Sequence, residues 1–323
     1  MGRIGPPRRW ALIVCAAIGL GLIAAPVVFQ MFDRAPQGAT MLKAFKPFMT
    51  EQRLTGFQNE IAQIDAAVHE TNTAVQTRLA AHGSSAVSGG SYSDFAKQWP
   101  QIHSTMSDLL TKVHANLPNY QAVAALPSFT LFPWFFVIPG AFVLIAAVLA
   151  LRSPTSARPA QVVLAVLGIG LILAPVAFQM FSRAPKGGKM MDAFTTIETT
   201  QNVAKIQGYF GTMAAGQGAL RLDVVPALEH TGLTASDIAR TYPAVATLDG
   251  NWVHILNDMT PMIGAMSDSV THYQAIKALP PFPLFPWFFV IPGLLVAGLA
   301  LAPGSGRRST TSVAVPELQG AIA

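Results

Sequence analysis

The side chains in this sequence best suited to act as bases or metal ligands are its seven histidines. None belongs to an HExxH pair, and the only spacing typical of metal ligands joins His254 to Asp258, four residues apart on one predicted helix face. We therefore interpret the histidines as solvated surface residues and expect neither a metal nor another cofactor. They fall in two polar stretches, with His69, His82, His103 and His114 in the first and His230, His254 and His272 in the second.

Other catalytic patterns are also missing from the sequence. There is no GxSxG nucleophile elbow and no GxxxxGK[ST] phosphate loop. The single cysteine, Cys15, excludes an intramolecular disulfide, a CxxC redox pair and a cysteine-rich zinc site. The sequence therefore predicts a protein that is not an enzyme.

The composition is that of a membrane protein. Hydrophobic residues make up 51% of the chain and charged residues 11%, with a mean hydropathy of +0.42. Four uncharged apolar runs, at about 10–31, 132–151, 162–181 and 284–302, each have the roughly 20 residues that a transmembrane helix needs. We read the first as a retained span rather than a signal peptide, because its core is long, it lacks a small-x-small cleavage site, and its counterpart at 162–181 is internal.

Arginines flanking the spans predict their orientation, because positive charge near a span favours the cytoplasmic side. Segments 1–9, 152–161 and 303–323 should be cytoplasmic, and 32–131 and 182–283 should form two extracytoplasmic domains. The three short segments hold seven arginines against one acid, Glu317, which accounts for the net charge of +5 without a nucleic-acid partner. These arginines are Arg3, Arg8, Arg9, Arg152, Arg158, Arg307 and Arg308.

Internal comparison predicts a tandem duplication. APVVFQMFDRAP at 25–36 recurs as APVAFQMFSRAP at 174–185, and LFPWFFVIPG at 131–140 recurs at 284–293. The second match extends back to Tyr120 and Tyr273, and a weaker one joins 93–100 to 236–243. Each copy is a span, an outer domain of about 100 residues and a span, so the copies should be parallel and related by a pseudo-two-fold axis along the membrane normal.

Apolar periodicity predicts that the outer domains are helical hairpins or bundles, which makes the whole chain an all-α integral membrane protein. A glycine- and serine-rich hinge at 82–91 separates two stripes in the first domain, and the second should break at 216–218 and start a helix at Thr234 with Asp237. The two hairpins could pair within one chain or in a homodimer. The stripes are Phe57, Ile61, Ile64, Val68, Val75 and Leu79, then Phe95, Trp99, Ile102, Met106, Leu109, Val113 and Leu117.

Two arginines just beyond the spans, Arg34 and Arg183, are the best candidates for a functional contact. Each could bind a lipid phosphate, anchor its span at the interface, or cap the last helical turn. Trp134 and Trp287 occupy corresponding places at the start of the second and fourth spans and should lie at the outer interface.

Within the spans there is no ionisable side chain of the kind that ion-coupled transporters and proton pumps use. The remaining candidates concern helix shape and packing. We expect kinks at Pro26 and Pro175 and a small-residue packing face that includes Gly21 and Gly170. Pro139 with Gly140 and Pro292 with Gly293 interrupt the second and fourth spans, and we favour a structural kink there over a broken-helix site of the transporter type.

The paired motifs FQMFxRAPxG and ALPxFxLFPWFFVIPG resemble those of uncharacterised multi-pass envelope proteins of mycobacteria and related actinobacteria. The resemblance covers both halves of the chain. It implies a plasma-membrane location and brings no assigned activity or functional residue.

Three functions fit these observations. The favoured one is a non-catalytic membrane protein whose outer domains bind membrane lipid, an envelope protein partner or a second copy of the chain, as an accessory subunit of a lipid-handling complex. The second is an extracytoplasmic ligand sensor, which would need a separate output partner because the cytoplasmic segments are short. The third, a transporter or channel subunit, is motivated by the repeat and opposed by the apolar membrane core.

Overall fold

A computed structural model describes residues 9–153 and 157–302, and every regular element in these ranges is a helix. The predicted N-terminal segment, apart from Arg9, and the predicted tail beyond Ala302 lie outside the described residues. The chain forms two compact units. The first, which we call the span unit, comprises the described parts of 1–23, 137–173 and 290–323; the second, the bundle unit, comprises 24–136 and 174–289.

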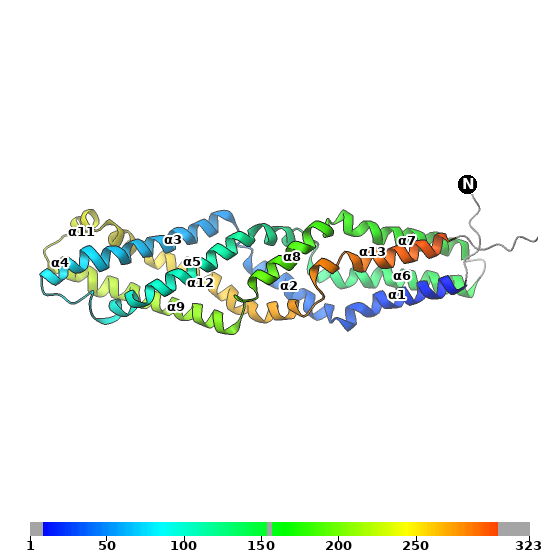
Figure 1. Cartoon of the computed structure of the whole chain (residues 1–323), viewed down its shortest axis with the longest axis horizontal. Coiled ribbons are helices and arrows are strands. Elements are labelled where there is room, and N and C mark those ends of the chain that lie inside the picture. Colours follow the sequence, from blue (N-terminus) through cyan, green and yellow to red (C-terminus); the bar gives the residue numbers. More distant parts are fainter. Residues whose placement is uncertain (1–8, 154–156, 303–323) are drawn as a thin grey trace, which may run out of the picture. The chain divides into compact units, whose positions relative to one another are not determined.

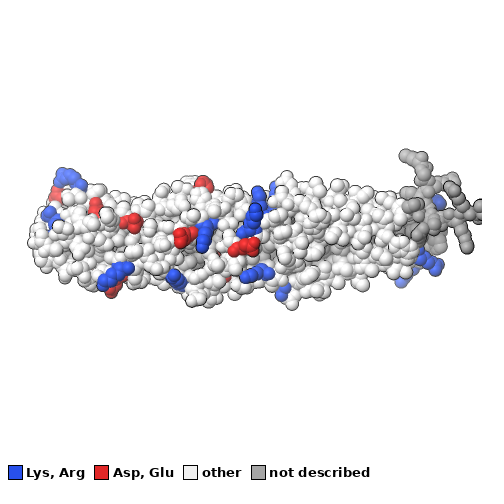
Figure 2. Space-filling model, viewed as in Figure 1, with Lys and Arg blue, Asp and Glu red and all other residues white. Residues whose placement is uncertain are grey.

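Four helices are long and apolar enough to cross a membrane, as predicted (Figure 1). They are α1 (Arg9–Val28), α6 (Phe132–Arg152), α7 (Ala157–Ala177) and the helical stretch Phe282–Leu301, most of which is α13 (Trp287–Leu301). Short 3-10 helices, η2 (Phe129–Leu131) and η5 (Phe282–Leu284), precede α6 and α13. Apart from Arg9, Arg152 and Arg158 at or next to their ends, these helices carry no charged residue, and the face drawn in Figure 2 is correspondingly white there.

Small side chains hold the span unit together. Its buried core includes Cys15, Val143, Ala147, Leu164 and Val296. Two glycine pairs bring backbones close: a methyl group added to Gly19 would lie 2.8 Å from the carbonyl oxygen of Gly140, and one added to Gly168 would lie 2.8 Å from that of Gly293. Such close crossings are typical of membrane helices, where packing replaces the hydrophobic effect as the source of association.

Gly21 and Gly170 do not form a packing face within the described part of this chain. Both glycines have open space where a side chain would be, and the buried small residues lie two positions earlier, at Gly19 and Gly168. Small residues spaced four apart can be found on more than one face of a helix, so this spacing alone does not show which face is buried.

Helices α6 and α13 run through Pro139–Gly140 and Pro292–Gly293, so the broken-helix alternative is wrong at these sites. The glycines at these sites serve the helix crossings instead. Proline is tolerated inside a membrane helix where neighbouring helices and local adjustments compensate for the missing N–H.

Helices α1 and α7 contain Pro26 and Pro175 near their ends, and the breaks come four residues later, at Gln30 and Gln179. These two glutamines have φ angles of 52° and 53°, in the left-handed region that side chains rarely adopt. The new helices, α2 (Met31–Phe45) and α8 (Met180–Phe194), begin at once. The expected kinks are thus sharp turns between two helices.

The bundle unit contains two series of helices with matching lengths. In the first, α2 is followed by α3 (Glu51–Glu70), a π-helix (Thr71–Val75), α4 (Gln76–Ala81) and α5 (Gly90–Ala124). In the second, α8 is followed by α9 (Thr200–Ala219), a π-helix (Leu220–Val224), α10 (Val225–His230), α11 (Ala235–Thr241) and α12 (Pro243–Lys277). We call residues at the same place in the two series corresponding residues; α3 and α9 are 20 residues long, and α5 and α12 are 35.

The two series pack against each other within one chain (Figure 1). Helices α3 and α9 each contact both long helices, α5 and α12. The short helices cross over: α2 of the first series packs on α12 of the second, and α8 packs on α5. Of the two pairings that the sequence left open, the structure therefore has the intramolecular one.

The predicted stripes of the first series form the core between these helices. Twelve of the thirteen residues are buried, and Val113 is half-buried. The predicted break at 216–218 is wrong, because α9 and its π-helix continue to α10 and the chain turns only after His230. Gly216 is small for a different reason: a methyl group there would lie 2.4 Å from the ring of Phe95.

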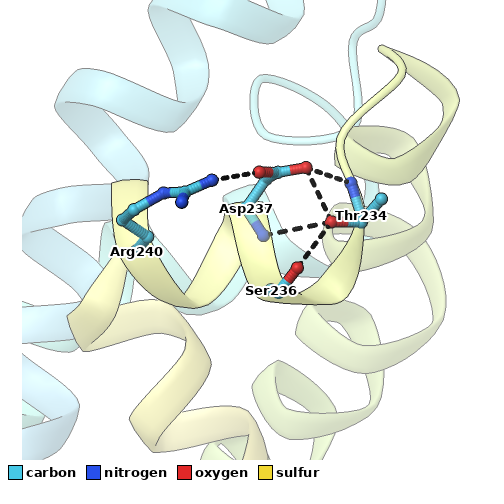
Figure 3. Close-up of polar contacts among 4 residues, drawn as sticks. All are labelled: Thr234, Ser236, Asp237 and Arg240. Atoms are coloured by element: carbon cyan, nitrogen blue, oxygen red, sulfur yellow. Dashed lines mark hydrogen bonds and ion pairs between the residues drawn. The ribbon is translucent and has the colours of Figure 1, made fainter.

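Helix α11 starts as predicted, at Thr234 (Figure 3). The backbone N–H of Asp237 donates to Oγ1 of Thr234 at 3.2 Å, and the Thr234 N–H donates to Oδ2 of Asp237 at 3.1 Å. This capping box satisfies two N–H groups that a helix start leaves without intrahelical partners. The weaker sequence match, between 93–100 and 236–243, does not join residues at the same place in the two series. Its last residues differ in position, because Pro100 lies inside α5 whereas Pro243 begins α12.

Candidate functional site: an apolar cavity in the helical bundle

The two short helices of the bundle unit are fixed by corresponding hydrogen bonds. The Tyr120 hydroxyl of α5 donates to the Leu42 carbonyl of α2 at 2.8 Å, and the Tyr273 hydroxyl of α12 donates to the Met191 carbonyl of α8 at 2.7 Å. Burial raises the pKa of both tyrosines, and for Tyr273 the nearby charges of Asp192 and Glu198 raise it further. Both hydroxyls therefore stay protonated and act as donors.

An apolar cavity of about 60 Å³ lies where these short helices meet the long ones. Both series contribute to its wall, mainly through methionine and phenylalanine. Methionine side chains are flexible and polarisable, so a wall built from them can adapt its shape. These residues are Met41, Met49, Met190, Met191, Met262 and Met266 with Phe45, Phe48, Phe129, Phe194 and Phe282.

One carboxylic acid, Glu198, belongs to the cavity wall. It is 1% exposed, and its Oε2 atom has no hydrogen-bond partner among the described residues. Burial raises the pKa of this carboxyl group to about 7, because the low-dielectric surroundings disfavour the charged form. The corresponding residue of the first series is Met49, also buried in the wall. The two sides of the cavity therefore differ in polarity.

Beside the cavity a surface groove of about 650 Å³ runs between α2 and the C-terminal end of α5. It shares five wall residues with the cavity and has two exposed lysines at the C-terminal end of α2, Lys43 in its last turn and Lys46 just after it. The shared residues are Leu42, Met49, Tyr120, Val123 and Phe129.

The structure places Arg34 and Arg183 at the ends of the long helices. Nη1 of Arg34 donates to the carbonyl of Ala278, just after α12, at 3.0 Å, and to that of Phe29 at 3.4 Å. Nη1 of Arg183 donates to the carbonyl of Ala125, just after α5, at 2.7 Å. Each arginine thus caps the long helix of the other series, where a positive charge is favoured by the helix dipole. The cap that we expected on the span itself is made mainly on another helix.

Trp134 and Trp287 also keep corresponding surroundings. Each is 48% exposed and meets a phenylalanine edge-to-face, Trp134 with Phe32 at 5.6 Å and Trp287 with Phe181 at 5.7 Å between ring centroids. Half-exposed aromatic rings of this kind are suited to an interface between water and hydrocarbon.

His254 and Asp258, the two residues with a spacing typical of metal ligands, belong to a cluster of charged side chains. Asp258 accepts from Arg53 at 3.0 Å, and His254 lies 3.5 Å from the same carboxylate oxygen. Glu60 lies close enough for the charge of Asp258 to add to the effect of burial, and its pKa is raised to about 7. Among the described residues no group of three or more histidine, cysteine, aspartate or glutamate side chains could hold a metal ion.

Sequence reasoning missed Glu198 and the methionines as site residues. The signal was available: in the repeat, Glu198 stands where the first copy has Met49, and an acid at a position that is apolar in the other copy marks an exception. Comparison of the chain with protein-family models, curated proteins and solved structures gave no match. The described residues thus form an all-helical protein with four helices long and apolar enough to cross a membrane and an apolar cavity in its helical bundle.

Proposed function

We propose that this protein is a non-catalytic, multi-pass protein of a bacterial plasma membrane whose helical bundle binds an apolar component of the envelope, such as the chain of a membrane lipid. In this proposal the bundle lies outside the cytoplasm, both termini lie inside, and the protein serves as an accessory subunit of a lipid-handling complex. Its protein partner is another envelope protein or a second copy of the chain.

The apolar cavity is the observation that carries the proposal. The methionine and phenylalanine side chains of its wall offer apolar atoms with which a hydrocarbon group can make contact. A cavity of this composition stays dry and accepts apolar groups. It also adjoins a groove whose volume of about 650 Å³ falls in the range of roughly 300–1,000 Å³ typical of ligand sites.

The proposed duplication rests on the repeated sequence blocks, supported by the matching lengths of the helices and the equal φ angles at Gln30 and Gln179. The proposed orientation rests on the flanking arginines, of which Arg9, Arg152 and Arg158 are among the described residues. The sequence resemblance supplies the bacterial setting.

Purification in native nanodiscs followed by mass spectrometry of bound lipids and proteins tests the function. We expect a stoichiometric apolar ligand, a partner protein or both. Val113→Phe, which adds a ring at the cavity wall, should reduce bound ligand, whereas the matched change Val253→Phe at an exposed site should not. Absence of both ligand and partner from the wild-type protein would contradict the proposal.

Cysteine labelling tests the orientation. In a chain with Cys15 replaced by alanine, a cysteine at the exposed position Ser88 should react with an impermeant maleimide in intact cells, and one at Ser156 should not. Labelling at 156 alone would reverse the topology.

A further inference from the structure

The groove beside the cavity is basic on one side of the bundle only. Lys43, in the last turn of α2, and Lys46, its C-cap residue, line the groove. The corresponding residues at the end of α8 are Asp192 and Thr195. Thr195 is engaged with the Tyr273 hydroxyl at 2.8 Å. An anion would therefore be attracted to the first side and repelled from the second.

The deep wall of the cavity strengthens this polarity. Met49 separates the groove from the cavity on the basic side, while Glu198 lines the cavity at the corresponding place on the acidic side. The apolar wall disfavours an anionic group inside the cavity, and ionised Glu198 would repel it as well. The apolar part of a ligand belongs in the cavity and its charged part in the groove.

We propose that the groove and cavity together form a binding site for an anionic amphiphile with a single apolar chain, such as a long-chain fatty acid. Its carboxylate pairs with Lys43 and Lys46, and its chain passes between Leu42, Met49 and Phe129 into the cavity. This inference rests on the proposed lipid-binding function and adds the charge, the chain number and the direction of the ligand.

The volumes favour a single chain. A cavity of about 60 Å³ holds only a short segment of hydrocarbon before the wall moves, whereas the groove outside it is about ten times larger. Because the wall has six methionines, rotation of their side chains can lengthen the space without moving a helix. A second chain would have to lie on the surface of the bundle.

Photo-crosslinking in nanodiscs tests the site. The probe is a palmitic acid analogue with a mid-chain diazirine, compared with the corresponding alcohol and amine, and the labelled peptides are identified by mass spectrometry. We expect the acid to label cavity-wall residues of α2, α5 and α8 more strongly than the alcohol, and the amine least. Lys43→Glu with Lys46→Glu should reduce labelling by the acid about tenfold, since two attractive charge pairs become repulsive.

The matched control is Lys186→Glu with Lys189→Glu, which makes the same charge change at exposed positions of α8. It should leave labelling within about twofold. Lys43→Gln with Lys46→Gln gives an intermediate loss and guards against misfolding of the doubly acidic variant, and thermal unfolding in detergent checks all three.

Equal labelling by acid, alcohol and amine, unaffected by the lysine changes, would overturn the anionic-ligand inference while leaving the proposed lipid-binding function intact. Labelling confined to the span helices would overturn the site. If, in addition, the purified protein carried neither lipid nor partner, the proposed function would fail as well.

Discussion

The two series of helices in the bundle unit share a backbone plan and differ at the cavity. They agree in helix length, in the left-handed glutamine that starts the series, in the threonine cap before α3 and α9, and in the π-helix that follows. They differ where α2 and α8 approach the cavity. The first series has Lys43, Lys46 and Met49 there, and the corresponding residues of the second series are Asp192, Thr195 and Glu198. The shared features maintain the fold, and the divergent ones are where a specific function can be added to it.

The largest difference should appear in the pH dependence of stability. The pKa of Glu198 is raised from 4.5 to about 7 by burial, so the folded protein binds a proton that the unfolded chain releases between these values. Stability from this group is present below about pH 4.5 and is lost as the pH rises through 7. Glu198→Met, which copies the first series, should therefore stabilise the protein at pH 8 by up to about 3 kcal/mol and by little at pH 4.5.

Unfolding in detergent at pH 4.5 to 8 measures this effect. Glu60 has a pKa raised to about 7 by burial and by Asp258, so part of the pH dependence should remain in the Glu198→Met variant. Met49→Glu is the reciprocal variant and should steepen the pH dependence. An identical pH profile for wild type and Glu198→Met would contradict the assignment.

The next difference between the two series is the size of two residues in the bundle core. Gly216 faces the ring of Phe95, whereas the residues corresponding to these two are Ala67 and Leu248. Gly216→Ala should destabilise the protein by about 1–3 kcal/mol, because the added methyl group overlaps the buried ring. Phe95→Leu should recover part of the loss when combined with it, as in the other series.

Thermal unfolding of the two single variants and the double variant gives the coupling between these sites. Additive losses would mean that the two residues do not compensate each other.

Smaller and equal effects are expected at the reciprocal caps. Arg34→Ala and Arg183→Ala each remove a hydrogen bond to the end of a long helix and a favourable charge near the helix dipole. Each should lower the free energy of unfolding by about 1 kcal/mol. A loss for one arginine only would show that the two ends of the bundle are not energetically equivalent.

The smallest effect should come from the two left-handed glutamines. Gln30→Gly and Gln179→Gly relieve a φ angle near 52° that disfavours any side chain, so each should stabilise the protein by about 0.5–1 kcal/mol. Measured as shifts in the unfolding midpoint, the two changes should agree. Destabilisation by either would mean that the glutamine side chain contributes more than its backbone costs.

Sequence patterns predicted the elements whose signal is local. The spans followed from hydropathy, the stripes from Phe57 to Leu79 from helical periodicity, and the start of α11 from Thr234 and Asp237. Contacts between elements were beyond reach. Gly19 and Gly21 look alike in the sequence, and only the approach of Gly140 distinguishes them.

The cavity has the same character. Residues of its wall come from several helices that are far apart in the chain, so no local sequence pattern predicts the cavity. Glu198 follows an ordinary run of threonines and isoleucine, and its unusual environment comes from packing alone. The crossing of α2 onto α12 likewise depends on tertiary contacts that periodicity does not encode.

The reciprocal caps also mean that contacts between the two series can form only late in synthesis of the chain. Helix α2 and Arg34 emerge from the ribosome long before α12, whose end Arg34 caps, and α5 likewise waits for α8 and Arg183. The first half of the chain therefore spends its synthesis with an open apolar face. A neighbouring nascent chain presents the same complementary surface, so exchange of halves between two chains would reproduce the contacts between the two series and give an interlocked dimer.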